Sequence, residues 1–332
     1  MTAVRGAALA AALPISFGDV KAAEARLAEH LTPTPFRNYP QIDALIGHDV
    51  QVFVKHENHQ PTQSFKIRNG LNTILGRTAE QRARGVIGAS TGNHGMGVAY
   101  AGKLTGTPVT ICVPVGNNPE KNAAINALGA TLIEVGQTYD ETVESCRMLS
   151  EERDLALVHS TNDPLVIAGA GTMTLEILRQ QPDLDALVIA VGGGSQAVGA
   201  LTVALEQRPA LKVYAVGAAG APAQYDSWST GRRLEKQKVD TFAEGIATGA
   251  AYELTFDALR EGLSDFVRVT DHEMFQAIRD FLRITHNVPE GAGAAGLAGL
   301  AKLVPRLAGK KVGIVMCGGN LSEKDLRIAV RP

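Results

Sequence analysis

Short runs of apolar residues alternate with longer helix-like segments along most of this chain. The runs do not switch between apolar and polar residues as half-exposed strands do. Runs of this kind, separated by helices, are typical of parallel strands whose sheet is covered on both faces. We therefore predict the α/β class, with two doubly wound, mostly parallel sheets and helices on both faces. The expected strands are residues 50–55, 85–88, 108–113, 131–135, 187–191, 212–216 and 312–316.

The segments between these runs show apolar residues at helical spacing. They predict helices over residues 65–75, 93–104, 121–128, 138–153, 168–179 and 197–206. The strand–helix units of residues 85–158 predict a small α/β domain inserted into a larger one. We expect residues 16–84 and 159–332 to form that larger, cofactor-binding domain, and residues 1–15 to be a flexible extension.

Composition excludes several classes of protein. The 332 residues are 45% hydrophobic and 20% charged, which is usual for a globular protein and excludes disorder. The net charge of -2 provides no positive field for nucleic acid or an anionic membrane. No run reaches the ~20 apolar residues of a membrane helix. Cys112, Cys146 and Cys317 are too few for a disulfide framework, and unpaired cysteines favour a cytoplasmic location.

A glycine-rich turn follows the expected strand at 187–191. Gly192, Gly193 and Gly194 are followed by Ser195 and a helical pattern. A strand, a glycine turn and a helix start aim backbone N–H groups at a phosphate. A dinucleotide site would also need an acidic residue after the next strand, and none is present there. We predict a site for a single phosphate group; the alternative is a tight turn that binds nothing.

Lys66 stands at an unusual place for a lysine. The segment 57–70 turns at Pro61 and Thr62 and then enters a helix, for which Ser64 is a candidate cap. Lys66 therefore falls in the first helical turn, where the partial positive charge of the helix end lowers the pKa of the amine. Such a lysine can bond covalently to an aldehyde cofactor. The alternative is an ordinary lysine in solvent.

Two more segments carry groups suited to a ligand. Residues 90–94 form a small polar loop between an expected strand and helix, and hydroxyl and N–H groups there suit a carboxylate. Cys317 follows the strand at 312–316 beside two glycines. Ligands of open α/β sheets bind at the carboxyl ends of strands. Together with Lys66 and the glycine turn, these segments describe a site for one phosphate, one carboxylate and one aldehyde.

These motifs resemble those of the pyridoxal-phosphate enzymes of fold type II. Within that family the chain is similar to the serine/threonine dehydratase (ammonia-lyase) group, which also includes serine racemase. The resemblance covers residues 16–328. The motifs that carry it are Pro61 to Arg68 (PTQSFKIR), Ser90 to His94 (STGNH), Gly192 to Ser195 (GGGS), Pro289 to Ala294 (PEGAGA) and Cys317 to Asn320 (CGGN).

The resemblance assigns roles around the cofactor, pyridoxal 5'-phosphate. It implies that Lys66 holds the cofactor covalently and that Phe65 packs on the pyridine ring. It places Asn93 at the ring hydroxyl, Glu290 near the ring and Cys317 at the ring nitrogen.

The resemblance also assigns the two loops. Cofactor phosphate would be bound by Gly192, Gly193, Gly194 and Ser195. Substrate carboxylate would be bound by Ser90, Thr91, Gly92, Asn93 and His94.

The reaction implied by the resemblance is an elimination from a β-hydroxy-α-amino acid of the threonine or serine type. Lys66 would remove the Cα proton, and hydroxide would leave from Cβ with a proton from the cofactor phosphate. The products would be a 2-oxo acid and ammonia. A thiol such as Cys317 cannot hold the pyridine nitrogen protonated as a carboxylate would, which favours elimination over prolonged carbanion chemistry.

Three positions depart from the family pattern. Thr91 stands where the racemase has a serine that acts as a base, which favours dehydration over racemisation. Met96 and Ala170 stand where relatives often carry glutamine. We take Ala170 as a substrate contact. If either Met96 or Ala170 lines the pocket, the enzyme would accept a bulkier β-substituent, such as that of 3-phenylserine. The alternative is that both side chains pack away from the pocket. Residues 217–222 lack the acidic residue of metal-binding relatives, so we expect no metal site.

Two other functions remain open from the sequence. One is an amino-acid racemase of the same fold, and the other is a non-catalytic regulatory protein that retains the scaffold. We expect a small amino acid as the binding partner, neither nucleic acid nor membrane, and assembly as a homodimer or homotetramer.

Overall fold

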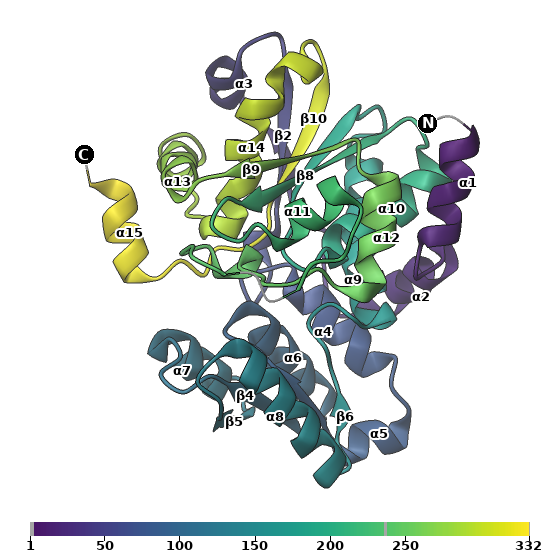
Figure 1. Cartoon of the computed structure of the whole chain (residues 1–332), viewed down its shortest axis with the longest axis vertical. Coiled ribbons are helices and arrows are strands. Elements are labelled where there is room, and N and C mark those ends of the chain that lie inside the picture. Colours follow the sequence, from purple (N-terminus) through teal and green to yellow (C-terminus); the bar gives the residue numbers. More distant parts are fainter. Residues whose placement is uncertain (1–2, 236–237, 332) are drawn as a thin grey trace.

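The chain folds around two sheets, one larger than the other (Figure 1). The computed structural model describes residues 3–235 and 238–331. The larger sheet has six strands, and all of its neighbouring pairs are parallel except β1 with β2. In spatial order the strands are β1 (Phe36–Asn38), β2 (Gln51–His56), β10 (Lys311–Met316), β7 (Ala186–Ala190), β8 (Lys212–Ala218) and β9 (Asp265–Val269).

The smaller sheet has four strands and is entirely parallel. Its strands, in spatial order, are β5 (Thr131–Glu134), β4 (Val109–Val113), β3 (Val86–Ala89) and β6 (Ala156–Leu157). All four lie within residues 85–158, and we propose that this stretch is a small domain inserted into a larger one formed by residues 16–84 and 159–332. The predicted α/β class with two doubly wound, mostly parallel sheets is confirmed.

Helices cover both sheets. They are α1 (Ala3–Ala12), α2 (Phe17–Leu27), α3 (Pro40–Ile46), α4 (Lys66–Leu75), α5 (Ala79–Arg84), α6 (Asn93–Thr105), α7 (Pro119–Ala127), α8 (Tyr139–Glu152), α9 (Pro164–Gln180), α10 (Ser195–Gln207), α11 (Ala223–Thr230), α12 (Glu253–Gly262), α13 (Asp271–Thr285), α14 (Gly291–Leu307) and α15 (Glu323–Val330), with single turns of 3-10 helix at η1 (Glu57–His59) and η2 (Glu244–Ile246).

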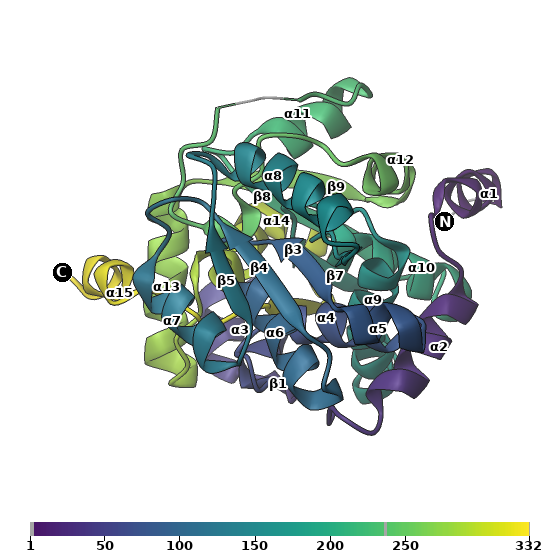
Figure 2. The same ribbon diagram turned by 90° about the horizontal axis from the view of Figure 1, so that it is seen from below.

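The order of the strands explains how helices reach both faces. The chain moves one way across the large sheet from β7 through α10 to β8, and the other way from β9 through α14 to β10. Because crossovers between parallel strands are right-handed, opposite directions put α10 and α14 on opposite faces. Figure 2 shows the same arrangement in the small sheet, with α8 on one side and α6 and α7 on the other.

Three strands, β1, β6 and β9, were not predicted from the sequence. β1 and β6 have only 3 and 2 residues, and β9, at a sheet edge, has two charged residues among its five and so lacks a continuous apolar run. We also expected residues 1–15 to be a flexible extension. This is wrong for residues 3–12, which form α1. Residues 1–2 lie outside the described part of the chain. Leu9 is only 1% exposed and lies against Gly262 of α12, and this burial fixes the helix.

Helix α4 lies at the junction of the two sheets and carries Lys66 (Figure 1). It packs against α6 on one side and α9 on the other. Both contacts are made at glycines. A Cβ on Gly97 of α6 would lie 2.5 Å from the carbonyl oxygen of Lys66, and one on Gly169 of α9 would lie 2.5 Å from that of Arg68. The backbone of α4 is therefore in direct contact with both neighbouring helices, which leaves Lys66 little freedom to shift.

A buried network of four charges also holds α4. Arg68 is 1% exposed, and its guanidinium donates to Glu57 over 2.8 Å and to Glu176 over 2.7 Å. Lys55 donates to the same Glu176 over 2.7 Å and to the carbonyl oxygen of Thr34 over 2.8 Å. Two cations and two anions balance, and they join β2, η1, α4 and α9.

The pKa of Glu57 shows the effect of this pairing. Burial raises the pKa of the carboxyl, but the attraction and hydrogen bonds of Arg68 outweigh it and lower the pKa below its ordinary value. Glu57 is therefore held as the carboxylate.

We predict that Glu57→Gln lowers the free energy of unfolding by about 3–5 kcal/mol, because it leaves Arg68 buried with one carboxylate fewer. Urea unfolding monitored by circular dichroism measures the change. Arg147→Gln is the matched control, since Arg147 pairs with Glu144 and Glu151 on the surface of α8 and its loss should leave the unfolding midpoint unchanged. Equal midpoints for Glu57→Gln and the wild type would show that the buried network does not hold α4.

Candidate active site

A cavity of about 220 Å³ lies between the two sheets. The segments that form it follow the carboxyl ends of β3, β6, β7 and β10 or lie beside them, as expected for open α/β sheets. Its lining residues are Phe65, Lys66, Ser90, Thr91, Gly92, Asn93, His94, Lys121, Tyr139, Ser160, Thr161, Gly193, Glu244, Gly245, Ala247, Thr248, Tyr252, Glu290, Ala292 and Cys317.

Lys66 is the first residue of α4, as predicted, and its side chain lines the cavity. The ammonium donates to the carbonyl oxygen of Ser160 over 3.2 Å and lies 5.1 Å from the ring centre of Phe65. Burial lowers the pKa of Lys66 to about 8, although Cys317 and Glu290 act in the opposite direction. We predicted a lowered pKa from the helix end; desolvation is the main cause. Near physiological pH the neutral, nucleophilic fraction of this amine is therefore much larger than that of an ordinary lysine.

The predicted phosphate turn directly follows β7. Gly194 adopts a positive φ of 97° and precedes the first residue of α10, Ser195. In the described part of the chain, the N–H groups of Ser195, Gln196 and Ala197 find no hydrogen-bond partner. Unpartnered N–H groups at the start of a helix can bind an anion.

Of the four residues predicted for this turn, only Gly193 lines the cavity. A Cβ on Gly193 would lie 2.1 Å from the hydroxyl oxygen of Thr161, so no larger residue fits. Its carbonyl oxygen accepts hydrogen bonds from Thr255 over 2.7 Å and from Gln224 over 3.2 Å. The turn is thus held in place through the carbonyl oxygen of Gly193.

All five residues predicted for the carboxylate loop line the cavity. The hydroxyl oxygen of Ser90 accepts from the N–H groups of Gly92 over 3.1 Å and Gly95 over 2.8 Å, so it shapes the loop. Burial lowers the pKa of His94 to about 3, which keeps the ring neutral, and its Nδ1 has no partner among the described residues.

Asn93 connects this loop to the far end of the chain. Its amide donates to Glu290 over 2.6 Å and its carbonyl oxygen accepts from Asn320 over 2.8 Å. Burial raises the pKa of Glu290. Burial also raises the pKa of the Cys317 thiol, with Glu290 contributing, so the thiol keeps its proton.

Backbone hydrogen bonds join the predicted motifs to one another. The N–H of Phe65 donates to the carbonyl oxygen of Cys317 over 3.0 Å, and the N–H of Glu290 donates to that of Gly318 over 3.0 Å. The lysine, glutamate and cysteine segments are therefore fixed side by side, although more than 200 positions separate the first from the other two.

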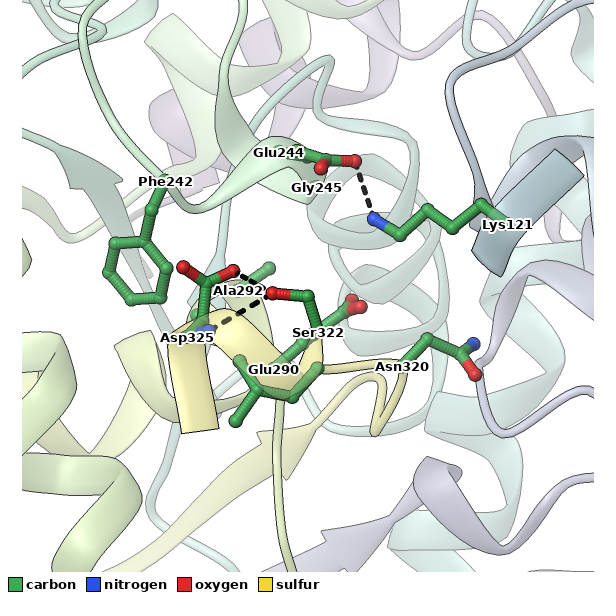
Figure 3. A pocket seen from close by; sticks show the side chains of 11 residues that line it. Lys121, Phe242, Glu244, Gly245, Glu290, Ala292, Asn320, Ser322 and Asp325 are labelled. Carbon is green, nitrogen blue, oxygen red and sulfur yellow. Dashed lines mark hydrogen bonds and ion pairs between the residues drawn. The ribbon is translucent and has the colours of Figure 1, made fainter. Parts of the chain in front are cut away.

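A smaller pocket adjoins the cavity beside the start of α15 (Figure 3). Lys121 and Glu244 line both spaces, and Figure 3 shows the Lys121 ammonium reaching across to the Glu244 carboxylate. This ion pair connects α7, beside the small sheet, with η2 beside the large one. Glu290 likewise faces both spaces.

One predicted substrate contact, Ala170, does not line the cavity. Ala170 is fully buried inside α9 and does not line the cavity, because its side of the helix faces the core. The prediction that Ala170 binds substrate is therefore wrong in this structure. Met96 is also buried in a core cluster away from the cavity. Both positions have the alternative role that we considered, remote packing.

Several lining residues were not predicted from the sequence. Tyr139 and Ser160 follow β5 and β6, and Tyr252 precedes α12. The rule that ligands bind at the carboxyl ends of strands would have singled out Ser160, had the short strand β6 been recognised. Lys121 and Glu244 carry no sequence signal that we can name.

No helix in the described part of the chain has the length and apolar character needed to cross a membrane. Residues 3–235 and 238–331 contain no group of three or more His, Cys, Asp or Glu side chains placed to hold a metal ion.

Comparison with known proteins identifies relatives along nearly the whole chain. Residues 27–318 match the family described as "Pyridoxal-phosphate dependent enzyme". The chain is 36% identical over 307 residues to L-threonine ammonia-lyase of Thermotoga maritima, covering 92% of this chain and 76% of that one. It is 33% identical to L-threo-3-hydroxyaspartate ammonia-lyase of Pseudomonas sp., covering 92% and 95%.

Among solved structures, maize serine racemase superposes with a TM-score of 0.89 at 28% identity, over 95% of this chain and 96% of the racemase.

We predict that the cofactor-free protein takes up pyridoxal phosphate at a rate that rises with pH and levels off above about 8. Only the neutral amine attacks an aldehyde, and the pKa of Lys66 is lowered to about 8. The rate of increase of visible absorbance measures the uptake. Nα-acetyl-lysine, whose side-chain amine is free, is the control for the aldehyde's own titration. The rate at which this compound reacts with pyridoxal phosphate should keep rising towards the amine's pKa of about 10.4. The same profile for protein and control would contradict a tuned Lys66.

Proposed function

Because this chain belongs to the family of pyridoxal-phosphate-dependent enzymes and its relatives are ammonia-lyases, it is a carbon–oxygen lyase, and we propose that its substrate is a β-hydroxy-α-amino acid of the threonine or serine type. The products are a 2-oxo acid and ammonia. The observation that carries the proposal is a lysine amine of lowered pKa in a cavity that is also lined by the carboxylate loop and by Gly193 of the phosphate turn.

The residues present fit the cofactor. Lys66, which lines the cavity, provides an amine for its aldehyde. The unpartnered N–H groups of Ser195, Gln196 and Ala197, which follow the cavity residue Gly193 in the chain, provide donors for its phosphate. Phe65 and Asn93 also line the cavity, and in this proposal Phe65 packs on the ring and Asn93 hydrogen bonds to it. Bound pyridoxal phosphate supplies an aldehyde that joins an amino group and a ring that accepts electrons from the substrate's Cα.

The chain's own groups then divide the work. Lys66 removes the proton from Cα, because its lowered pKa makes the amine an available base. Among the described residues, the N–H groups of Thr91, Asn93 and His94 have no hydrogen-bond partner. These groups and the neutral His94 ring hold the substrate's carboxylate. Cys317 stays protonated and so places no negative charge at the ring nitrogen. This favours the departure of a β-leaving group over long-lived negative charge at Cα.

The positions of Met96 and Ala170 bear on the size of the substrate. We linked a bulkier β-substituent, such as that of 3-phenylserine, to Met96 and Ala170, and both lie outside the cavity. These positions therefore give no support for 3-phenylserine, and we propose the smaller hydroxy amino acids as preferred substrates.

Racemisation is the second candidate, and the similarity to maize serine racemase over 95% of this chain favours it. Thr91 lines the cavity in the loop where the racemase is expected to carry its second base. A threonine is bulkier than serine there, so we place elimination first.

We also propose a cytoplasmic location and assembly as a homodimer or homotetramer. Three free, buried cysteines among the described residues support the first. Gel filtration with light scattering tests the second, and a monomer under assay conditions would contradict it.

We predict that Lys66→Ala abolishes both the visible absorbance of the bound cofactor and the release of 2-oxo acid. The change removes the proposed base, and the other lysine that lines the cavity, Lys121, is held in an ion pair with Glu244. Lys103→Ala, a change at an exposed lysine of α6, is the control and should keep both properties. Turnover by Lys66→Ala at the wild-type rate would refute the assignment.

A substrate panel separates the candidate activities. We expect the enzyme to release 2-oxo acid from threonine and serine, and less from 3-phenylserine. We also expect the release of oxo acid to be faster than the conversion of one enantiomer of the substrate into the other. The panel also includes 3-hydroxyaspartate, and chiral chromatography of the remaining substrate gives the racemisation rate. Equal amounts of both enantiomers before any oxo acid accumulates would make the enzyme a racemase.

A further inference from the structure

Tyr139 is a cavity residue that the proposed function does not yet use. It is the first residue of α8, and its side chain reaches the cavity that holds Lys66. It is one of two tyrosines on the cavity wall; the other is Tyr252.

The hydroxyl of Tyr139 has only long contacts within the protein. Its oxygen lies 3.4 Å from the hydroxyl oxygen of Ser160 and 3.5 Å from the carbonyl oxygen of Ala89. Hydrogen bonds between oxygens are usually 2.7–2.8 Å long, so neither contact uses the full strength of this donor. The hydroxyl is free to move to a better acceptor.

The position of this hydroxyl relates it to both ends of a substrate. Ala89 directly precedes the loop that begins at Ser90, where the carboxylate would bind. Ser160 carries the carbonyl oxygen that accepts from the Lys66 ammonium over 3.2 Å. The Tyr139 hydroxyl therefore lies close both to the loop that would bind the carboxylate and to the residue that accepts from the Lys66 ammonium.

We propose that Tyr139 is a catalytic residue whose hydroxyl donates a hydrogen bond to the β-oxygen of the substrate as the Cβ–O bond breaks. This inference rests on the proposed elimination and names the residue that recognises its leaving group. A donor aimed at an oxygen that gains negative charge stabilises the transition state more than the ground state.

The electron and proton balance leaves Tyr139 unchanged. The Cα–H and Cβ–O bonds break, a Cα–Cβ double bond forms, and the Cβ–O electron pair leaves with the oxygen. In sum, the Cα proton and the hydroxide depart as water. Burial raises the pKa of Tyr139, so the phenol keeps its own proton and acts as a donor throughout.

The test compares two leaving groups on the same amino-acid skeleton. Serine loses hydroxide, which needs a donor, whereas 3-chloroalanine of the same configuration loses chloride, which does not. Both give pyruvate. We expect Tyr139→Phe to lower kcat for serine by about 100-fold, the effect of removing one such donor, and to change kcat for 3-chloroalanine by less than about threefold.

Tyr252→Phe is the matched control, since Tyr252 lines the same cavity and burial also raises its pKa. It should leave the ratio of the two kcat values at that of the wild type. An unchanged ratio in Tyr139→Phe, with both substrates slowed alike or neither slowed, overturns the proposal. If the wild-type enzyme releases pyruvate from neither substrate, the proposed function itself is contradicted.

Discussion

Helix α4 must hold one lysine at one place, and the buried pairing of Arg68 with Glu57 and Glu176 is the interaction that fixes this helix. Taking these charges out of water is costly, and that cost is offset only while every partner is present. The network therefore permits one arrangement of β2, η1, α4 and α9. Close glycine contacts with α6 and α9 act in the same direction, because backbone touching backbone leaves no room for α4 to slide. The reactive amine of Lys66 is therefore positioned through Arg68, two residues further along the helix, and its two carboxylate partners. None of these three residues lines the cavity.

The cavity itself is assembled from segments that are far apart in the sequence. Each follows a strand or begins a helix, and parallel strands bring their carboxyl ends to one edge of the sheet. Backbone bonds from Phe65 to Cys317 and from Glu290 to Gly318 then set their spacing. Burial in this region has opposite effects on different groups. It lowers the pKa of Lys66 and His94, and it raises the pKa of Glu290 and Cys317, so each group is shifted towards its neutral form. A cavity with little fixed charge suits a cofactor that brings its own phosphate.

Much of this could be predicted from the sequence, because the relevant signals are local. Among the described strands, the seven that carry continuous apolar runs were found, and the glycine turn at 192 and the lysine at a helix start follow from local chemistry. Strands β1 and β6 were missed because two or three residues carry no periodicity, and α1 because its order depends on the burial of Leu9 by a distant helix. Ala170 was assigned from a difference in residue type, which does not show which face of a helix a residue occupies. Tyr139 and the Arg68 network were missed because their roles depend on tertiary neighbours.

The central claim is that the Lys66 amine bonds covalently to pyridoxal phosphate. Reducing the cofactor-loaded enzyme with borohydride makes that bond permanent, and peptide mass spectrometry then identifies the modified lysine. The account predicts that the cofactor remains on the peptide containing Lys66 and on no other. Recovery of the cofactor on Lys121, the second lysine of the cavity, or on no lysine at all, would contradict it.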